Sequence, residues 1–196
     1  MKSIDIIHGE HRALASVLQG LRFVVGEIRA GRLQPDFRLL CSMVDYITQV
    51  PDKLHHPKED NHLFPALRAR SADAATLIDT LEAQHAEGYR MTTGLLQALV
   101  HYQARGDKAF VEFDATVQNY LDFSWKHLNM EEGELLPLAR RELTADDWKE
   151  IDDAFAANFD PYSGAQGEFD DLFGRIVGMT PAPYGLGPAS PGSTAR

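Results

Sequence analysis

The sequence predicts an all-α protein: an up-down-up-down four-helix bundle with a short fifth helix and a Gly/Pro-rich C-terminal tail. Three observations support this prediction. Apolar residues recur at helical spacing along most of the chain, and no segment shows the period of two that is typical of strands. Short connections separate the long periodic segments, as they do between neighbouring helices of a bundle. After residue 160, glycine and proline interrupt the pattern repeatedly.

The first two helices are bounded by turn and capping residues. We expect the first helix over about 3–30, ending at Gly31. The second begins near Asp36, whose side chain can cap the first turn. Pro51 and Pro57 follow, and each removes a backbone donor and crowds the preceding turn. The sequence therefore predicts a kink or a break before the histidine-rich segment.

The remaining helices follow the same logic. The third is expected over about 73–105 and the fourth over about 107–141. Thr144, with Asp147 three residues later, resembles a capping box and predicts a fifth helix over 148–159.

The chain is expected to divide into a bundle domain with its extra helix, residues 1–160, and a tail, residues 161–196. Within the tail, apolar residues at helical spacing form a short amphipathic segment at 169–177, which we expect to dock on the bundle. The alternative is a homodimer or protein-partner surface. The residues of this segment are Phe169, Leu172, Phe173, Ile176 and Val177.

Composition excludes several classes of protein. The 196 residues carry a formal net charge of −10, which argues against a nucleic-acid partner. The single cysteine, Cys41, excludes an internal disulfide framework and a thiolate metal cage. No apolar run is long enough for a membrane span, and the N-terminus has no apolar signal region. We expect a soluble, cytoplasmic protein.

The most informative feature is a phrase that occurs twice, at 55–65 and at 127–137. Both copies read His-x-x-x-Glu-acid-x-(His or Glu)-Leu-apolar-Pro. Residues four apart lie on one face of a helix, so each copy presents an imidazole and a carboxylate in the same direction. Two such helices can face a common buried point, which is how helix bundles build two-metal carboxylate sites. The two pairs are His55 with Glu59 and His127 with Glu131.

The other two long helices also carry histidines. His8 and His11 are three apart in the first helix, and His85 lies in the third. Every expected long helix therefore offers a nitrogen donor.

This ordered combination resembles the hemerythrin-like (HHE) cation-binding domains over about residues 1–140. That family has a histidine in the first helix, His-x-x-x-Glu in the second, a histidine in the third and His-x-x-x-Glu in the fourth. The resemblance implies a four-helix bundle around a non-haem di-iron site with bridging carboxylates. Imidazole and carboxylate donors without thiolate suit iron, with manganese as the alternative, better than structural zinc. The implied ligands are His11, His55, Glu59, His85, His127 and Glu131.

Two departures from the oxygen-carrying hemerythrins bear on function. Those proteins have a second histidine one turn before the third-helix ligand, where this chain has Leu81. They also use His-x-x-x-x-Asp in the fourth helix. A simple oxygen-storage role is therefore disfavoured. Candidates for an additional ligand or an outer partner are His8, His56, His62 and Glu134.

The expected ligand of such a centre is a small oxidant: dioxygen, hydrogen peroxide or nitric oxide. The first hypothesis is a peroxidase-like, catalase-like or nitric oxide-handling activity in oxidative stress, nitrosative stress or iron handling. The alternative is an oxygen, nitric oxide or iron sensor or carrier without turnover. No catalytic residue outside the ligand set is identifiable. Tyr89 and Tyr120 lie near the expected ligand faces, but ordinary core aromatics are the favoured interpretation. His101 is expected at the surface.

Overall fold

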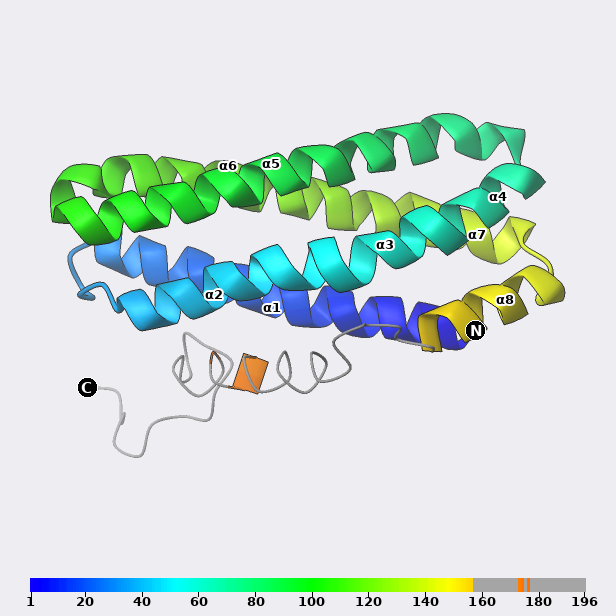
Figure 1. The fold of residues 1–196 in the computed structure, drawn as a ribbon, viewed down its shortest axis with the longest axis horizontal. Coiled ribbons are helices and arrows are strands. Elements are labelled where there is room, and N and C mark those ends of the chain that lie inside the picture. Colours follow the sequence, from blue (N-terminus) through cyan, green and yellow to red (C-terminus); the bar gives the residue numbers. More distant parts are fainter. Residues whose placement is uncertain (157–172, 175, 177–196) are drawn as a thin grey trace.

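The computed structural model describes residues 1–156, 173, 174 and 176, and over these residues the chain is all-helical with no strand. Four long helical stretches lie side by side (Figure 1). A short helix packs against the start of the first stretch. The first stretch is α1 (Lys2–Arg29), the second joins α2 (Phe37–Val50), α3 (His56–Lys58) and α4 (Phe64–Arg70), the third is α5 (Ala75–Arg105), the fourth joins α6 (Phe110–Met130) and α7 (Leu136–Glu142), and the short helix is α8 (Ala145–Ala156).

The ends of the helices follow the capping signals. The Asp36 carboxylate accepts hydrogen bonds from the backbone N–H groups of Arg38 at 3.0 Å and Leu39 at 3.3 Å, which confirms it as the cap of α2. Gly31 and Gly106 adopt positive φ angles of 70° and 63° just beyond α1 and α5, a conformation that glycine reaches without a steric cost.

Of the predicted kink or break at Pro51 and Pro57, the break does not occur. The second stretch stays helical from Phe37 to Arg70, and wide π-helical turns at Pro51–His55 and Glu59–Leu63 accommodate the prolines. A third π turn, Glu131–Leu135, lies in the second copy of the repeated phrase.

Each π turn ends two residues before a proline. A proline cannot donate a hydrogen bond, and its ring crowds the carbonyl four residues earlier. The preceding residue donates to the carbonyl five residues back, which widens the turn and keeps the helix continuous. The three bonds run from His56 to Pro51, from Phe64 to Glu59 and from Leu136 to Glu131, just before Pro57, Pro65 and Pro137.

The capping box before α8 is confirmed. The backbone N–H and the hydroxyl of Thr144 donate to Asp147 Oδ2 at 2.8 and 2.7 Å, and the Asp147 N–H donates back to the Thr144 hydroxyl at 3.3 Å. The helix begins at Ala145, three residues earlier than predicted, and the predicted residues 157–159 lie outside the described residues.

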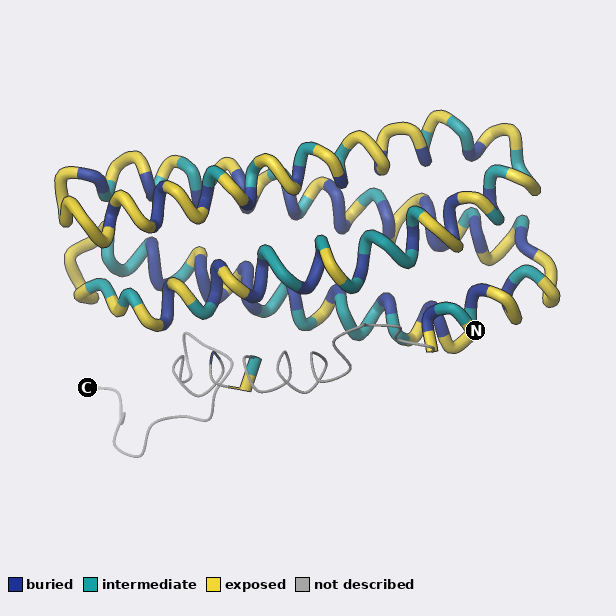
Figure 2. The backbone as a smooth tube through the Cα atoms, in the orientation of Figure 1, coloured by how far each residue is buried: buried dark blue, intermediate teal, exposed yellow. Residues whose placement is uncertain are grey.

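The interior contains two apolar clusters separated by a polar layer. The first cluster runs from Leu14 to Val25 on α1 and includes inward residues of α2, α5 and α6. The second contains Ile4 and Ile7 with residues of α4, α5, α7 and α8. Among the described residues, nine buried side chains are polar or charged. Buried and exposed residues alternate along each long stretch (Figure 2). Six of the nine buried polar residues are the predicted ligands.

Two described residues of the tail, Phe173 and Ile176, pack on the bundle. Ile176 is fully buried and Phe173 is partly buried against the first cluster, with the Phe173 ring 5.9 Å from that of Tyr46. The predicted partners Phe169, Leu172 and Val177 lie outside the described residues. No helix in the described part of the chain is long and apolar enough to span a membrane.

Candidate metal centre

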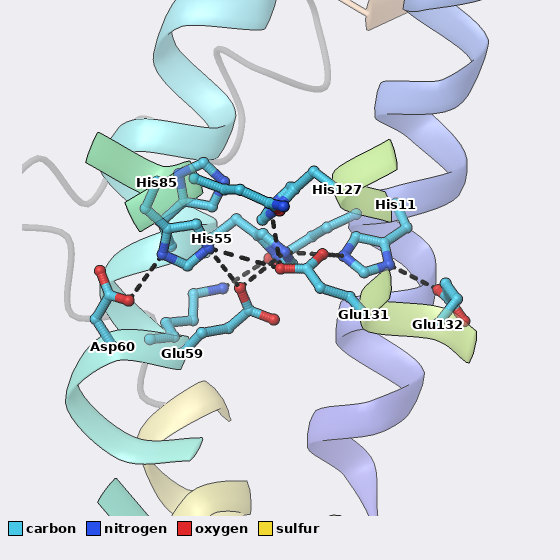
Figure 3. A network of polar contacts seen from close by, with 12 residues as sticks. His11, His55, Glu59, Asp60, His85, His127, Glu131 and Glu132 are labelled. Atoms are coloured by element: carbon cyan, nitrogen blue, oxygen red, sulfur yellow. Dashed lines mark hydrogen bonds and ion pairs between the residues drawn. The ribbon is translucent and has the colours of Figure 1, made fainter. Parts of the chain in front are cut away.

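The structure brings the six predicted ligand residues together in the layer between the two apolar clusters (Figure 3). None is more than 7 % exposed, and both glutamates are fully buried. Glu59 and Glu131 begin π turns, so the wide turns lie at the carboxylates of the centre. The six residues are His11, His55, Glu59, His85, His127 and Glu131.

The Glu131 carboxylate lies between two pairs of histidines and gives each pair one oxygen. Its Oε2 is 3.1 Å from His11 Nε2. Its Oε1 is 3.0 Å from His127 Nε2 and 3.6 Å from His85 Nε2. This is the arrangement expected of a carboxylate that bridges two metal ions.

Glu59 lies beside the same two pairs from the opposite copy of the phrase. Its Oε2 is 3.4 Å from His55 Nε2 and 3.6 Å from His85 Nε2. The four histidines therefore form two pairs, His11 with His55 and His85 with His127, and Glu59 lies near both pairs.

The outward nitrogens of these four histidines are held by a closed ring of contacts between the helical stretches. In each stretch, a residue adjacent to a candidate ligand accepts a hydrogen bond from the histidine of the next stretch, and the fourth stretch closes on the first. The contacts are His55 Nδ1 to Glu10 at 2.8 Å, His85 Nδ1 to Asp60 at 2.7 Å, His127 Nδ1 to Gln84 at 2.9 Å and His11 Nδ1 to Glu132 at 2.6 Å. Figure 3 shows Asp60 and Glu132 on the outer sides of the centre.

These outer partners determine how the imidazoles face the centre. An ionised carboxylate only accepts hydrogen bonds, so Nδ1 carries the proton and Nε2 is the nitrogen left for a metal. Lys58 adds a contact of 2.6 Å to Glu10, which keeps that carboxylate in place beside His55. Three outer partners are carboxylates and the fourth, Gln84, is an amide.

The Nε2 atoms of His11 and His55 lie 2.9 Å apart. Two nitrogens bound side by side to one metal ion at about 2.1 Å each are separated by about 3 Å, so this spacing fits a shared ion. In the metal-free chain a proton satisfies the pair: burial lowers the pKa of His55, which stays neutral and accepts. Burial also opposes protonation of His11, but Glu131 and Glu132 outweigh it and raise the His11 pKa to about 9.

The pKa values of the two buried glutamates, Glu59 and Glu131, are shifted in opposite directions. Burial and the neighbouring charge of Glu131 raise the pKa of Glu59 well above its usual range. Burial acts in that direction on Glu131 as well, but His127, His11 and His85 outweigh it and hold its pKa well below the usual range. Burial opposes the charge on His85, yet Asp60 and Glu131 raise its pKa to about 9. At neutral pH the metal-free centre therefore holds protons on His11 and His85, and the raised pKa of Glu59 works toward its protonated form.

The buried polar atoms of this layer fit bound metal cations. Both oxygens of Glu59, both oxygens of Glu131, and the Nε2 atoms of His85 and His127 are buried without a hydrogen bond in the described part of the chain. Leaving such atoms unsatisfied costs free energy, and a divalent cation satisfies carboxylate oxygens and imidazole nitrogens together.

The four candidates for an additional ligand or outer partner differ in how close they lie to the centre. The His56 side chain lies at the centre, where one of its nitrogens groups with those of His85 and His127. His8 Nε2 lies 3.2 Å from Glu132 Oε2 on the outer side. His62 and Glu134 are exposed, as is His101.

The two tyrosines and Leu81 do not contribute donors. Tyr89 is 64 % exposed, and Tyr120 is buried in the first apolar cluster. Leu81 is fully buried in the second cluster, so its place on α5 faces apolar side chains.

Sequence reasoning missed the outer partners Glu10, Asp60, Gln84 and Glu132. The available signal was their position, since each is adjacent to a candidate ligand. That signal is weak because each partner accepts a hydrogen bond from a histidine of a different helical stretch.

Comparison with known proteins gives one match. The family model described as Hemerythrin HHE cation binding domain matches residues 2–139. No curated protein and no solved structure matches the chain.

Proposed function

The chain belongs to the hemerythrin HHE cation-binding family, and on that premise we propose that its buried histidines and glutamates hold two iron ions at which a small oxidant binds. The proposed ligands are His11, His55, Glu59, His85, His127 and Glu131, with manganese as the alternative metal. The proposed oxidants are dioxygen, hydrogen peroxide and nitric oxide. The bundle is proposed to run up-down-up-down, so that each long stretch brings its own ligands to the centre.

The observation that carries this proposal is the position of Glu131. One oxygen faces His11 and the other faces His127, while Glu59 lies against both histidine pairs. A single-metal site has no use for two buried carboxylates between two separate pairs of imidazoles. The donor set matches a pair of hard or borderline cations.

The side chains of the centre would supply affinity and orientation, and the metal pair would supply redox chemistry and open coordination positions. The carboxylates Glu10, Asp60 and Glu132 hold the Nδ1 protons of His55, His85 and His11. This contact makes each imidazole a stronger donor and fixes its ring. The apolar clusters above and below restrict water at the centre. No separate acid–base residue is assigned, so turnover would rest on the metals.

Metal content tests the proposal. Protein purified without a metal-affinity tag and reconstituted anaerobically with ferrous iron should hold about two irons per chain, with visible absorption that changes on adding azide, peroxide or nitric oxide. The double variant His55→Ala, His127→Ala should lose both irons and stay helical, because one donor of each position is gone. The matched control is His62→Ala, His101→Ala, which removes two exposed histidines. Full iron occupancy in the first double variant, or none in the unchanged protein, would refute the proposal.

Turnover distinguishes the two functional hypotheses. Consumption of peroxide or nitric oxide by the loaded protein, absent from the first double variant, supports an enzyme. Reversible spectral changes without consumption support a carrier or sensor.

A further inference from the structure

We propose that α8 positions a metal ligand of the centre, although it supplies none of the six proposed ligands itself. The Phe155 ring of α8 holds the Lys58 ammonium against Glu10. This carboxylate in turn holds the His55 imidazole, so docking of α8 and metal binding at His55 strengthen each other. The inference rests on the proposed two-metal function and adds Lys58 and Phe155 to it as positioning residues.

Three contacts in sequence join α8 to the centre. Lys58 Nζ lies over the Phe155 ring, 5.4 Å from its centroid, within the range of a cation–π interaction. The same ammonium donates to Glu10 Oε1 at 2.6 Å, and His55 Nδ1 donates to Glu10 Oε2 at 2.8 Å. Both oxygens of Glu10 are thus engaged by different groups, so the carboxylate cannot turn without losing one of the two contacts. We call Phe155, Lys58 and Glu10 the α8 link.

The Lys58 ammonium depends on its neighbours to stay in place. A lysine side chain is long and flexible, and it usually extends its ammonium into water. Here the Lys58 side chain is only 12 % exposed, and that of Glu10 is 18 % exposed. The face of the Phe155 ring and the Glu10 carboxylate replace part of the missing water. Without the ring face, Lys58 is free to turn toward solvent and to leave Glu10 less firmly held.

The position of Phe155 is fixed by the docking of the whole helix. Trp148, Ile151 and Phe155 recur at helical spacing and bury one face of α8 in the second apolar cluster. Ser3 donates to Asp152 Oδ1 from its backbone N–H at 2.8 Å and from its hydroxyl at 2.6 Å. These contacts hold α8 against the start of α1 (Figure 1). The ring is therefore in place only while α8 is docked.

The α8 link reaches one pair of histidines and not the other. Glu10 is the least exposed of the three outer carboxylates, since Asp60 and Glu132 are 38 % and 40 % exposed. It is also the one that a lysine contacts in the described part of the chain. The histidine that it holds, His55, is paired with His11. α8 should therefore affect the metal bound by this pair and leave the other metal nearly unchanged.

Coupling of this kind is reciprocal. If docked α8 raises the metal affinity by a given factor, bound metal raises the docking equilibrium of α8 by the same factor. The state of the centre is thereby reported by a helix that contains none of its ligands.

The test is a double-mutant cycle on Co²⁺ binding, followed by visible absorption. Lys58→Met keeps a long side chain and removes the ammonium, and Phe155→Leu keeps an apolar side chain and removes the ring face. Lys53→Met, at an exposed position of the same stretch, is the matched control. Lys58→Met should weaken one of two Co²⁺ sites by about tenfold, and Phe155→Leu should weaken the same site by about two- to fivefold. In the Lys58→Met background, Phe155→Leu should weaken it no further, because the group through which the ring acts is gone.

Hydrogen exchange provides a readout that a purely structural role would not move. In the unchanged protein, saturation with Co²⁺ should slow the exchange of α8 amides. In Lys58→Met, saturation should slow α8 less, while the protection gained in α5 is kept. A defect of folding alone would lower the protection with and without metal alike.

Each outcome decides one question. A Lys58→Met variant identical to Lys53→Met in Co²⁺ affinity and in α8 exchange would overturn the role of Lys58. A further loss of affinity on adding Phe155→Leu to Lys58→Met would overturn the link to α8. Should Phe155→Leu fail to fold, Phe155→Met takes its place in the cycle with the same criterion, because methionine fills irregular gaps in a core. Fewer than two Co²⁺ bound by the unchanged protein would overturn the proposed function itself.

Discussion

Metal binding should release protons, and the number released should fall as pH rises. His11 and His85 each have a pKa of about 9 in the metal-free chain, because carboxylates outweigh the effect of burial. A group with this pKa is about 99 % protonated at pH 7 and about half protonated at pH 9. A metal-bound imidazole must give up its Nε2 proton. The two histidines together should therefore release about two protons at pH 7 and about one at pH 9.

Glu59 works in the same direction. Any proton that its raised pKa leaves on the carboxyl group is also lost on binding, and this contribution can only shrink as pH rises. The release should thus fall by at least about one proton between pH 7 and 9. Binding should tighten as pH rises, with a steeper slope near pH 7 than near pH 9.

The assay is anaerobic titration of the metal-free protein with Mn²⁺, by calorimetry in pairs of buffers that differ in ionisation enthalpy. The variant Glu132→Gln should release fewer protons at pH 8 than the unchanged protein, because Glu132 is one of the two groups that raise the pKa of His11. The control is Glu134→Gln, an exposed position two residues further on. Equal release at pH 7 and 9, or a Glu132→Gln variant identical to the control, would refute the reasoning.

Four further outcomes are expected. The metal-free chain should lose stability in urea as pH rises through about 9, because the raised pKa values of His11 and His85 contribute stability that is fully present only below the unfolded value; greater stability at pH 10 than at pH 7 would contradict this. Phe64→Ala, which empties a fully buried position stacked 5.5 Å from His85, should cost about 3–5 kcal/mol of unfolding free energy, and an unchanged urea midpoint would contradict the packing. Gly94→Ala, with open space around the new methyl group inside α5, should gain about 0.5–1 kcal/mol, so a lower melting temperature would count against it. Glu10→Ala should weaken Co²⁺ binding by about 10–100-fold through His55, and an unchanged titration would rule out this outer role.

The helical period accounts for what could be predicted of the centre. The spacing of four in each phrase placed His55 with Glu59 and His127 with Glu131 on common faces, and the structure brings these faces together. The capping residues Asp36 and Thr144 were equally local signals and mark helix starts in the structure.

The failures have a common physical cause in the π turns. A regular helix places His62 almost in line with His55, seven residues earlier. The wide turn Glu59–Leu63 holds more residues per turn, so the positions after Glu59 are rotated and His62 is exposed. Local sequence also allowed a break at Pro51 and Pro57, because a helix of regular turns loses a hydrogen bond at each proline, whereas the observed π turns keep the helix continuous.

The outer partners could not be predicted from local spacing for a different reason. Glu10 and Gln84 accept hydrogen bonds from histidines more than forty residues away in the chain. The spacing of residues does not specify which helical stretches are neighbours in the bundle. Only the packed arrangement pairs them.

The separation of the apolar interior into two clusters has a consequence for how the molecule holds together. The two clusters are built from different parts of the same long stretches, and we expect each to open as a separate cooperative unit. The layer between them contains acids and imidazoles in place of apolar side chains, so we expect the coupling between the two units to be weak without metal. A metal pair bound there would act as a crosslink between the units. Loading would then convert two partly independent melting events into one and slow hydrogen exchange most at the α8 end of the bundle.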